Sequence, residues 1–223
     1  MLHPSTADTV SSRFMGSWID RAQTRIREWL TPLDRVAAMI PDCDHLLELG
    51  CGQGILIRKV AARIPRITGV DYDPRKCAMA REDLCRGLPG VTVVQGEILT
   101  FLAAMPDHAV GCVVLADTLA SNPPHVQERI LAESVRVLAR SGTLVLKIMD
   151  TTPVGKFVCS RLLSELIYRV LRLSVSSDQR LFHQSSVWYA DCLARLGLTT
   201  QLAALHRLLN HPFSHAVVLG VRV

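Results

Sequence analysis

The feature that most constrains the fold is a buried strand that runs directly into a glycine-rich turn and then a helix. The apolar run Leu46–Leu49 carries one carboxylate, Glu48, and is followed by glycines at alternate positions, Gly50, Gly52 and Gly54. Glycines let the backbone turn sharply, and the helix that begins there directs free N–H groups at a polar or anionic ligand. A dinucleotide-binding turn would need glycine at position 55, so the spacing fits E-x-G-x-G-x-G instead.

A second carboxylate follows at the end of the next strand-like run. In the stretch 69–73, Gly-Val-Asp-Tyr-Asp, Asp71 lies about 20 residues after the glycines, a position from which a carboxylate can accept hydrogen bonds from both hydroxyls of a ribose. Asp73 stands before Pro74 and is expected to cap a helix N-terminus. The glycine turn and Asp71 together predict a site for a ligand that contains a ribose.

Short apolar runs alternate with amphipathic segments between residues 45 and 150, which is typical of βαβ units and a parallel sheet. Two helices, divided by Pro32, are expected before this region. After it come an amphipathic segment at 155–174, a helix at 187–196, and two strand-like runs at 199–205 and 216–223. The last two runs predict a closing antiparallel hairpin.

Two further stretches complete a family resemblance. Gln95–Ile98 follows the third strand-like run, and Gly111–Leu119 contains the fourth. In this order, the motifs within residues 46–150 resemble those of the class I S-adenosylmethionine-dependent methyltransferases. The chain departs from the family pattern at two positions, because Glu97 stands where aspartate is commoner and Gly111 stands where many members have aspartate.

The resemblance implies an enzyme that binds S-adenosyl-L-methionine and releases S-adenosyl-L-homocysteine. It places Tyr72 against the adenine ring and Glu97 near the adenine amino group. The cofactor-binding residues that it implies are Glu48, Gly50, Cys51, Gly52, Gly54, Asp71, Tyr72, Gly96, Glu97, Ile98, Leu115 and Ala116. The expected fold class is α/β, with a Rossmann-like, doubly wound, mostly parallel sheet. A helical N-terminal extension, a helical insertion after strand five and the C-terminal hairpin are added to it.

The length of 223 residues suits one methyltransferase domain spanning residues 1–223. We divide it into an N-terminal helical cap (1–42), a cofactor-binding core (43–150), a helical lid or insertion (151–190), and a closing helix with the hairpin (191–223). Seven cysteines without a C-x-x-C pair indicate neither a zinc ribbon nor a disulfide framework. Because no signal peptide or membrane-length apolar run is present, we expect a soluble, cytoplasmic protein.

The acceptor residues are expected at the carboxyl ends of the strands, where ligands gather in this type of sheet. Four histidines are candidates for a catalytic base there: His125, His183, His211 and His215. The run 211–215, His-Pro-Phe-Ser-His, is the most suggestive, because two histidines and an aromatic ring at a hairpin tip could hold and deprotonate a hydroxyl. A rigid turn with solvated imidazoles is the alternative. No metal site is expected, since no cluster of convergent oxygen ligands is evident.

The leading functional hypothesis is O-methylation of a small apolar or aromatic acceptor of secondary metabolism, free or bound to an acidic acyl carrier protein. One alternative is a nucleic-acid methyltransferase, which the modest net charge of +5 does not favour. Residues 122–125, Asn-Pro-Pro-His, also lack the aromatic residue that would stack a base. Another alternative is a cofactor-binding protein without methyl transfer. The basic, amphipathic segment 155–174 could be a lid, a carrier-protein site or, less favoured, a membrane contact. The oligomeric state is left open.

Overall fold

The computed structural model describes residues 31–171, 181–205 and 213–222, with the backbone only for residues 163–171. The sheet lies in a compact unit that begins at Asp34. The first of the two expected N-terminal helices lies outside the described residues. The second begins after Pro32 as expected and is α2, Leu33–Met39.

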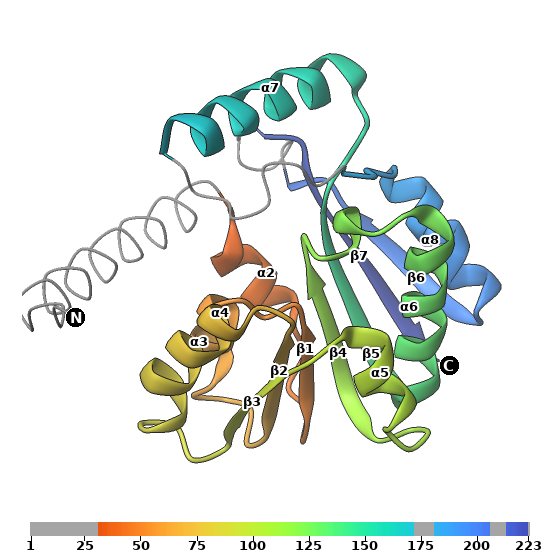
Figure 1. Ribbon diagram of the computed structural model, residues 1–223. Coiled ribbons are helices and arrows are strands. Elements are labelled where there is room, and N and C mark those ends of the chain that lie inside the picture. Colours follow the sequence, from red (N-terminus) through yellow and green to blue (C-terminus); the bar gives the residue numbers. More distant parts are fainter. Residues whose placement is uncertain (1–30, 172–180, 206–212, 223) are drawn as a thin grey trace, which may run out of the picture. The chain divides into compact units, whose positions relative to one another are not determined.

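The described residues form a seven-stranded sheet in the order β3-β2-β1-β4-β5-β7-β6 (Figure 1). Strands β1 to β5 pair in parallel, and β7 runs antiparallel between β5 and β6. The strand bounds are β1 Leu46–Leu49, β2 Ile67–Asp71, β3 Val91–Gln95, β4 Val110–Ala116, β5 Leu138–Met149, β6 Leu198–Ala203 and β7 His215–Arg222. The expected Rossmann-like α/β fold with its closing hairpin is therefore confirmed.

Helices cover both faces of the sheet. One hydrophobic cluster packs α5, α6 and α8 against one face, and the other packs α2, α3 and α4 against the opposite face. The helices after α2 are α3 Ile55–Val60, α4 Pro74–Ala80 with a π-helical turn Arg81–Cys85, α5 Ile98–Ala103, a 3₁₀ turn Leu119–Ser121, α6 Pro124–Val137, α7 Val154–Leu171 and α8 Ser186–Arg195. Helix α7 follows β5 after a short connection, so the insertion lies at the carboxyl ends of the parallel strands (Figure 1).

One boundary differs from the sequence prediction. The sequence predicts a helix over residues 126–139 and a break at Ser141-Gly142 before strand five. The helix instead ends at Val137, and β5 begins at Leu138, which pairs with Val110. The pairing register then shifts, and Ser141 adopts a positive φ of 60°. A long-range strand pair thus ends the helix early, and the Ser141-Gly142 dipeptide forms an irregularity within the strand.

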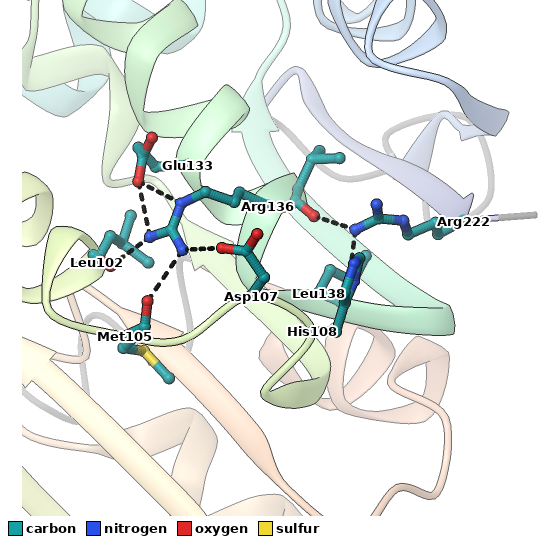
Figure 2. Close-up of polar contacts among 9 residues, drawn as sticks. Leu102, Met105, Asp107, His108, Glu133, Arg136, Leu138 and Arg222 are labelled. Atoms are coloured by element: carbon teal, nitrogen blue, oxygen red, sulfur yellow. Dashed lines mark hydrogen bonds and ion pairs between the residues drawn. The ribbon is translucent and has the colours of Figure 1, made fainter.

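Arg136, near the end of α6, joins that helix to the end of α5 and to the loop before β4. Its guanidinium donates to Asp107 Oδ1 (2.6 Å), to Glu133 Oε2 (2.9 Å), and to the backbone oxygens of Leu102 (2.6 Å) and Met105 (2.9 Å) (Figure 2). Leu102 lies in the last turn of α5 and Met105 just beyond it, so the arginine adds charge-assisted donors to carbonyls at the end of that helix.

Removing this arginine is expected to destabilise the domain. We expect Arg136→Ala to lower the free energy of unfolding by about 2 kcal/mol, since several charge-assisted hydrogen bonds to partly buried carbonyls are lost together. Urea denaturation followed by circular dichroism measures the change. Arg129→Ala is the matched control: this exposed arginine of the same helix should change stability by no more than about 0.5 kcal/mol. Equal effects of the two variants would contradict the assigned role.

Candidate active site

The glycine turn after β1 has the backbone geometry that the sequence predicts. Gly50, Gly52 and Gly54 all adopt positive φ, at 76°, 56° and 73°. A Cβ at Gly50 would lie 2.3 Å from Oγ1 of Thr118, whose hydroxyl donates to the Leu49 oxygen at 2.9 Å. A side chain at Gly50 would therefore both strain the backbone and collide with the loop after β4. The turn is closely fitted to that loop.

Asp71 connects the glycine turn to the end of β2. Its carboxylate is buried, with 5 % of the residue exposed. Oδ2 accepts from the Gly52 N–H at 2.8 Å, and Oδ1 accepts from the Asp73 N–H at 2.9 Å. Each carboxylate oxygen has a second lone pair, so Asp71 can hold the turn and still accept from a ribose hydroxyl. Sequence analysis predicted the ribose contact but missed the bond to Gly52.

The loops beyond Asp71 leave room for an adenine ring. Tyr72 is 60 % exposed, and a Cβ at Gly96 would meet nothing within 4 Å. The Gly96 N–H donates to the Asp71 backbone oxygen at 2.9 Å, which keeps this loop beside β2. Glu97 precedes α5 in extended conformation, is exposed, and makes no capping hydrogen bond with its side chain. The exposed ring of Tyr72 and the open backbone at Gly96 suit the two faces of an adenine ring. The exposed carboxylate of Glu97 suits its amino group.

These residues fit S-adenosylmethionine. Asp71, Tyr72, Gly96 and Glu97 would hold the adenosine, and the glycine turn would direct backbone N–H groups at the methionine carboxylate. Asp73 caps α4 as expected, accepting from the N–H groups of residues 75 and 76 at 2.9 and 3.3 Å. The cap by Asp73 is confirmed, and the cofactor contacts of Asp71, Tyr72, Gly96 and Glu97 stay predictions.

The other predicted cofactor residues are more deeply placed. Glu48 is 3 % exposed, within β1 and between Gly69 of β2 and Val114 of β4. Burial, together with the charge of Glu48, raises the pKa of the Cys51 thiol, so this cysteine is a neutral packing group. The Leu115 side chain is buried in one hydrophobic cluster, while Ile98 and Ala116 are partly buried and pack against the clusters.

A buried ion pair lies at the ends of β4 and β5, where sequence analysis assigned no lysine. Lys147 of β5 is fully buried, and its Nζ pairs with Oδ2 of Asp117, directly after β4. Asp117 has φ of 59°, and its N–H donates to the Lys147 oxygen at 2.9 Å. The Asp117 side chain is 32 % exposed, so the pair presents a carboxylate toward solvent while its ammonium stays buried. A lysine within the apolar run TLVLKIM was the only signal of it in the sequence.

Of the four candidate histidines, the structure brings His183 to the loop after β4. The Phe182 N–H donates to the Ala120 oxygen at 2.7 Å, which places the segment 181–185 directly beside that loop. The His183 ring packs edge to face on Phe157 of α7, with centroids 5.3 Å apart at 74°. Burial lowers the pKa of His183, the charge of Arg161 lowers it further, and the charge of Asp117 opposes both. A neutral imidazole at pH 7 is the consequence.

Of the other three candidates, the structure describes His125 and His215, and His211 lies outside the described residues. His125 is exposed in the first turn of α6. His215 is 4 % exposed and is the first residue of β7, opposite Met149 at the end of β5, with its ring 5.7 Å from that of Phe213.

In the described part of the chain, no three or more His, Cys, Asp or Glu side chains converge as metal ligands. None of its helices combines the length and hydropathy needed to cross a bilayer.

Comparison with known proteins agrees with this geometry. A family described as a methyltransferase domain matches residues 46–142. The chain is 36 % identical over 76 residues to an rRNA adenine N-6-methyltransferase of Saccharopolyspora erythraea, an alignment covering 34 % of this chain and 19 % of that protein. Alignments with the four curated relatives span 19–53 % of those proteins' lengths.

Solved structures share the fold over most of the chain. A chain of a Haloferax volcanii complex that contains the Trm112 methyltransferase activator superposes with a TM-score of 0.70 at 16 % identity, covering 92 % of this chain and 96 % of that one. An O-methyltransferase family protein from Burkholderia thailandensis gives 0.68 at 16 % identity, covering 92 % and 59 %. At such identities the likeness establishes the fold alone.

The sheet, the glycine turn, the ribose-side carboxylate and the matched family together define a class of protein. Residues 46–142 carry a methyltransferase domain within a Rossmann-like sheet, and that family implies S-adenosylmethionine as the methyl donor. The match confirms the family resemblance, and with it the enzyme class and the cofactor that the resemblance implies.

Proposed function

We propose that this protein transfers the methyl group of S-adenosylmethionine to a hydroxyl of a small, apolar or aromatic acceptor, with His183 as the general base. The observation that carries the proposal is a neutral, half-buried imidazole beside the loop after β4. In doubly wound sheets, ligands bind beyond the carboxyl ends of the strands near the switch in strand order, which here falls between β1 and β4. His183 lies beside the acceptor side of that point.

The surroundings of His183 suit an aromatic acceptor. Phe157 contributes a ring from α7, and Asp117 contributes a partly exposed carboxylate whose charge is balanced by Lys147. An apolar wall beside one polar group is the usual composition of a small-molecule site. The likeness to an O-methyltransferase family protein agrees with this acceptor class but is a likeness of fold.

The chemistry requires little beyond orientation and removal of one proton. S-adenosylmethionine supplies a methyl group on a sulfonium, which is already a good electrophile. His183 would accept the proton of the acceptor hydroxyl through a ring nitrogen. The oxygen lone pair would then form the new C–O bond as the bond from the methyl carbon to sulfur breaks, with its electron pair leaving on the sulfur of S-adenosylhomocysteine. Asp71 and the glycine turn would fix the donor, while Phe157 and the segment 181–185 would keep water from the acceptor.

Methylation of an RNA base is the second candidate, favoured by the short alignments with rRNA methyltransferases. The run 122–125 weighs against it. Asn122 and Pro123 lead into α6, the Asn122 backbone oxygen accepts from Gln127 at 2.7 Å, and exposed His125 stands where an aromatic residue would stack a base. Cofactor binding without methyl transfer is the third candidate.

Transfer of a labelled methyl group distinguishes the three. Purified protein is incubated with methyl-labelled S-adenosylmethionine and four acceptor sets: phenols and catechols, aryl groups bound to an acyl carrier protein, primary amines, and unmodified ribosomal RNA. Label bound through oxygen to an aromatic acceptor, free or carrier-bound, is the expected result. Label found only in RNA or in amines would overturn the proposal. Saturable cofactor binding with no transfer to any set would favour the third candidate.

A further inference from the structure

Gln127, near the start of α6, is fully buried although its side chain is a polar amide. Its Nε2 donates to the backbone oxygens of Asn122 at 2.7 Å and of Phe182 at 2.8 Å, and its Oε1 accepts from the Tyr189 hydroxyl at 2.7 Å. The amide therefore joins the loop after β4 to the segment 181–185 and to helix α8, which lie 55 and 62 residues later in the sequence.

The backbone of Phe182 is held from both sides. Its N–H donates to Ala120 at 2.7 Å, while its oxygen accepts from Gln127 at 2.8 Å. His183 is the next residue, so its backbone position relative to the loop after β4 depends on these two bonds. One of the two is supplied by the side chain of Gln127.

Helix α8 is anchored separately. The buried carboxylate of Asp150 accepts from the Ser186 hydroxyl at 2.6 Å and from the Ser186 N–H at 3.1 Å. The start of α8 is thus fixed to the end of β5 without help from Gln127. Loss of the Gln127 amide should release the segment 181–185 while leaving α8 in place.

Glutamine suits this position better than its near-isosteres. The site needs two donors facing carbonyl oxygens and one acceptor facing a hydroxyl, which is what a primary amide supplies. Burial raises the pKa of Tyr189, so its phenol stays protonated and donates. Methionine would remove the donor to two part-buried carbonyls and the acceptor of a phenol, and glutamate would direct negative charge at both carbonyls.

We propose that Gln127 is a positioning residue that holds His183 at the acceptor side of the methyl-transfer site. The proposal rests on the proposed function of His183 as base, but the placement of His183 can be measured without turnover. In Gln127→Met, the freed segment should expose the imidazole to water, so its pKa should rise toward the ordinary value of 6.5.

The primary experiment is an NMR titration of the His183 ring in the full chain. Gln127→Met is expected to raise the His183 pKa by about half a unit or more, and to speed exchange of the Phe182 amide proton by about tenfold or more. Tyr189→Phe keeps both carbonyl bonds and should change each quantity less. If Gln127→Met does not fold, Gln127→Asn, whose amide is one methylene shorter, is measured with the same expected direction.

Steady-state kinetics provide an independent test of the role of Gln127. Gln127→Met is expected to lower kcat by about tenfold with cofactor affinity unchanged, and to cause no further loss in a His183→Ala background. Val135→Ala is the matched control: it truncates a buried residue of the same helix, so it should lower stability without shifting the His183 pKa. Folded Gln127→Met with unchanged His183 pKa and unchanged Phe182 exchange would overturn the proposal. Full activity of His183→Ala would instead overturn the proposed function alone.

Discussion

Replacement of His183 by alanine is expected to lower kcat for methyl transfer by about 10²- to 10⁴-fold, the usual contribution of a general base. Cofactor affinity should not change, because Asp71 ends β2 and the glycine turn follows β1, whereas the segment of His183 is bonded to the loop after β4. Steady-state kinetics and calorimetry with S-adenosylhomocysteine measure the two quantities. His108→Gln is the control, since His108 contacts the Leu138 oxygen at the opposite edge of the sheet (Figure 2).

The pH dependence of kcat/KM of the wild-type enzyme tests whether the neutral imidazole of His183 is the base. The base acts as the neutral imidazole, so activity should be present above the His183 pKa and lost as the pH falls through it. Because burial lowers that pKa, the acid limb of kcat/KM should have its midpoint below 6.5. In His183→Ala this limb should disappear. An acid limb that persists unchanged in the variant would assign the base to another group.

Replacement of Asp71 by alanine should lower the affinity for S-adenosylmethionine by about 100-fold, or ~2.7 kcal/mol. Two effects combine, because the variant loses the ribose acceptor and also releases the Gly52 N–H that the carboxylate holds at 2.8 Å. Asp71→Asn should lose less, since one amide oxygen can still accept from Gly52. Isothermal titration calorimetry with the cofactor and with S-adenosylhomocysteine gives both values.

Asp73→Ala is the matched control for this variant. Asp73 caps α4 through its side chain, so its loss should cost about 1 kcal/mol of stability without a comparable loss of affinity. If Asp71→Ala binds the cofactor as tightly as Asp73→Ala does, the carboxylate at the end of β2 does not contact the ribose.

The cofactor side of the site was readable from the sequence because its requirements are local. Positive φ at Gly50, Gly52 and Gly54, and a carboxylate at the end of the next strand, follow from spacing within about 20 residues. The hairpin could also be predicted from the sequence. The position of β7 between β5 and β6 could not, because strand order depends on pairing between distant segments.

The acceptor side depends on side chains that meet only in the folded chain. The pairing of Lys147 with Asp117 gives no periodic signal, and Gln127 reads as an ordinary polar residue of a helix. Among the histidines, sequence reasoning favoured the run 211–215, whereas the backbone bonds of Phe182 bring His183 to β4. A histidine's role is set by its neighbours, and those neighbours are remote in sequence.

The close fit of Gly50 against Thr118 has a consequence for how such enzymes diversify. The ends of β1 and β4 are held together by contacts of Gly50, Leu49 and Thr118, which all belong to the region of the methyltransferase match. Substitutions in the segments that follow β5 can therefore change which acceptor is bound while these contacts, and the turn that they support, are kept.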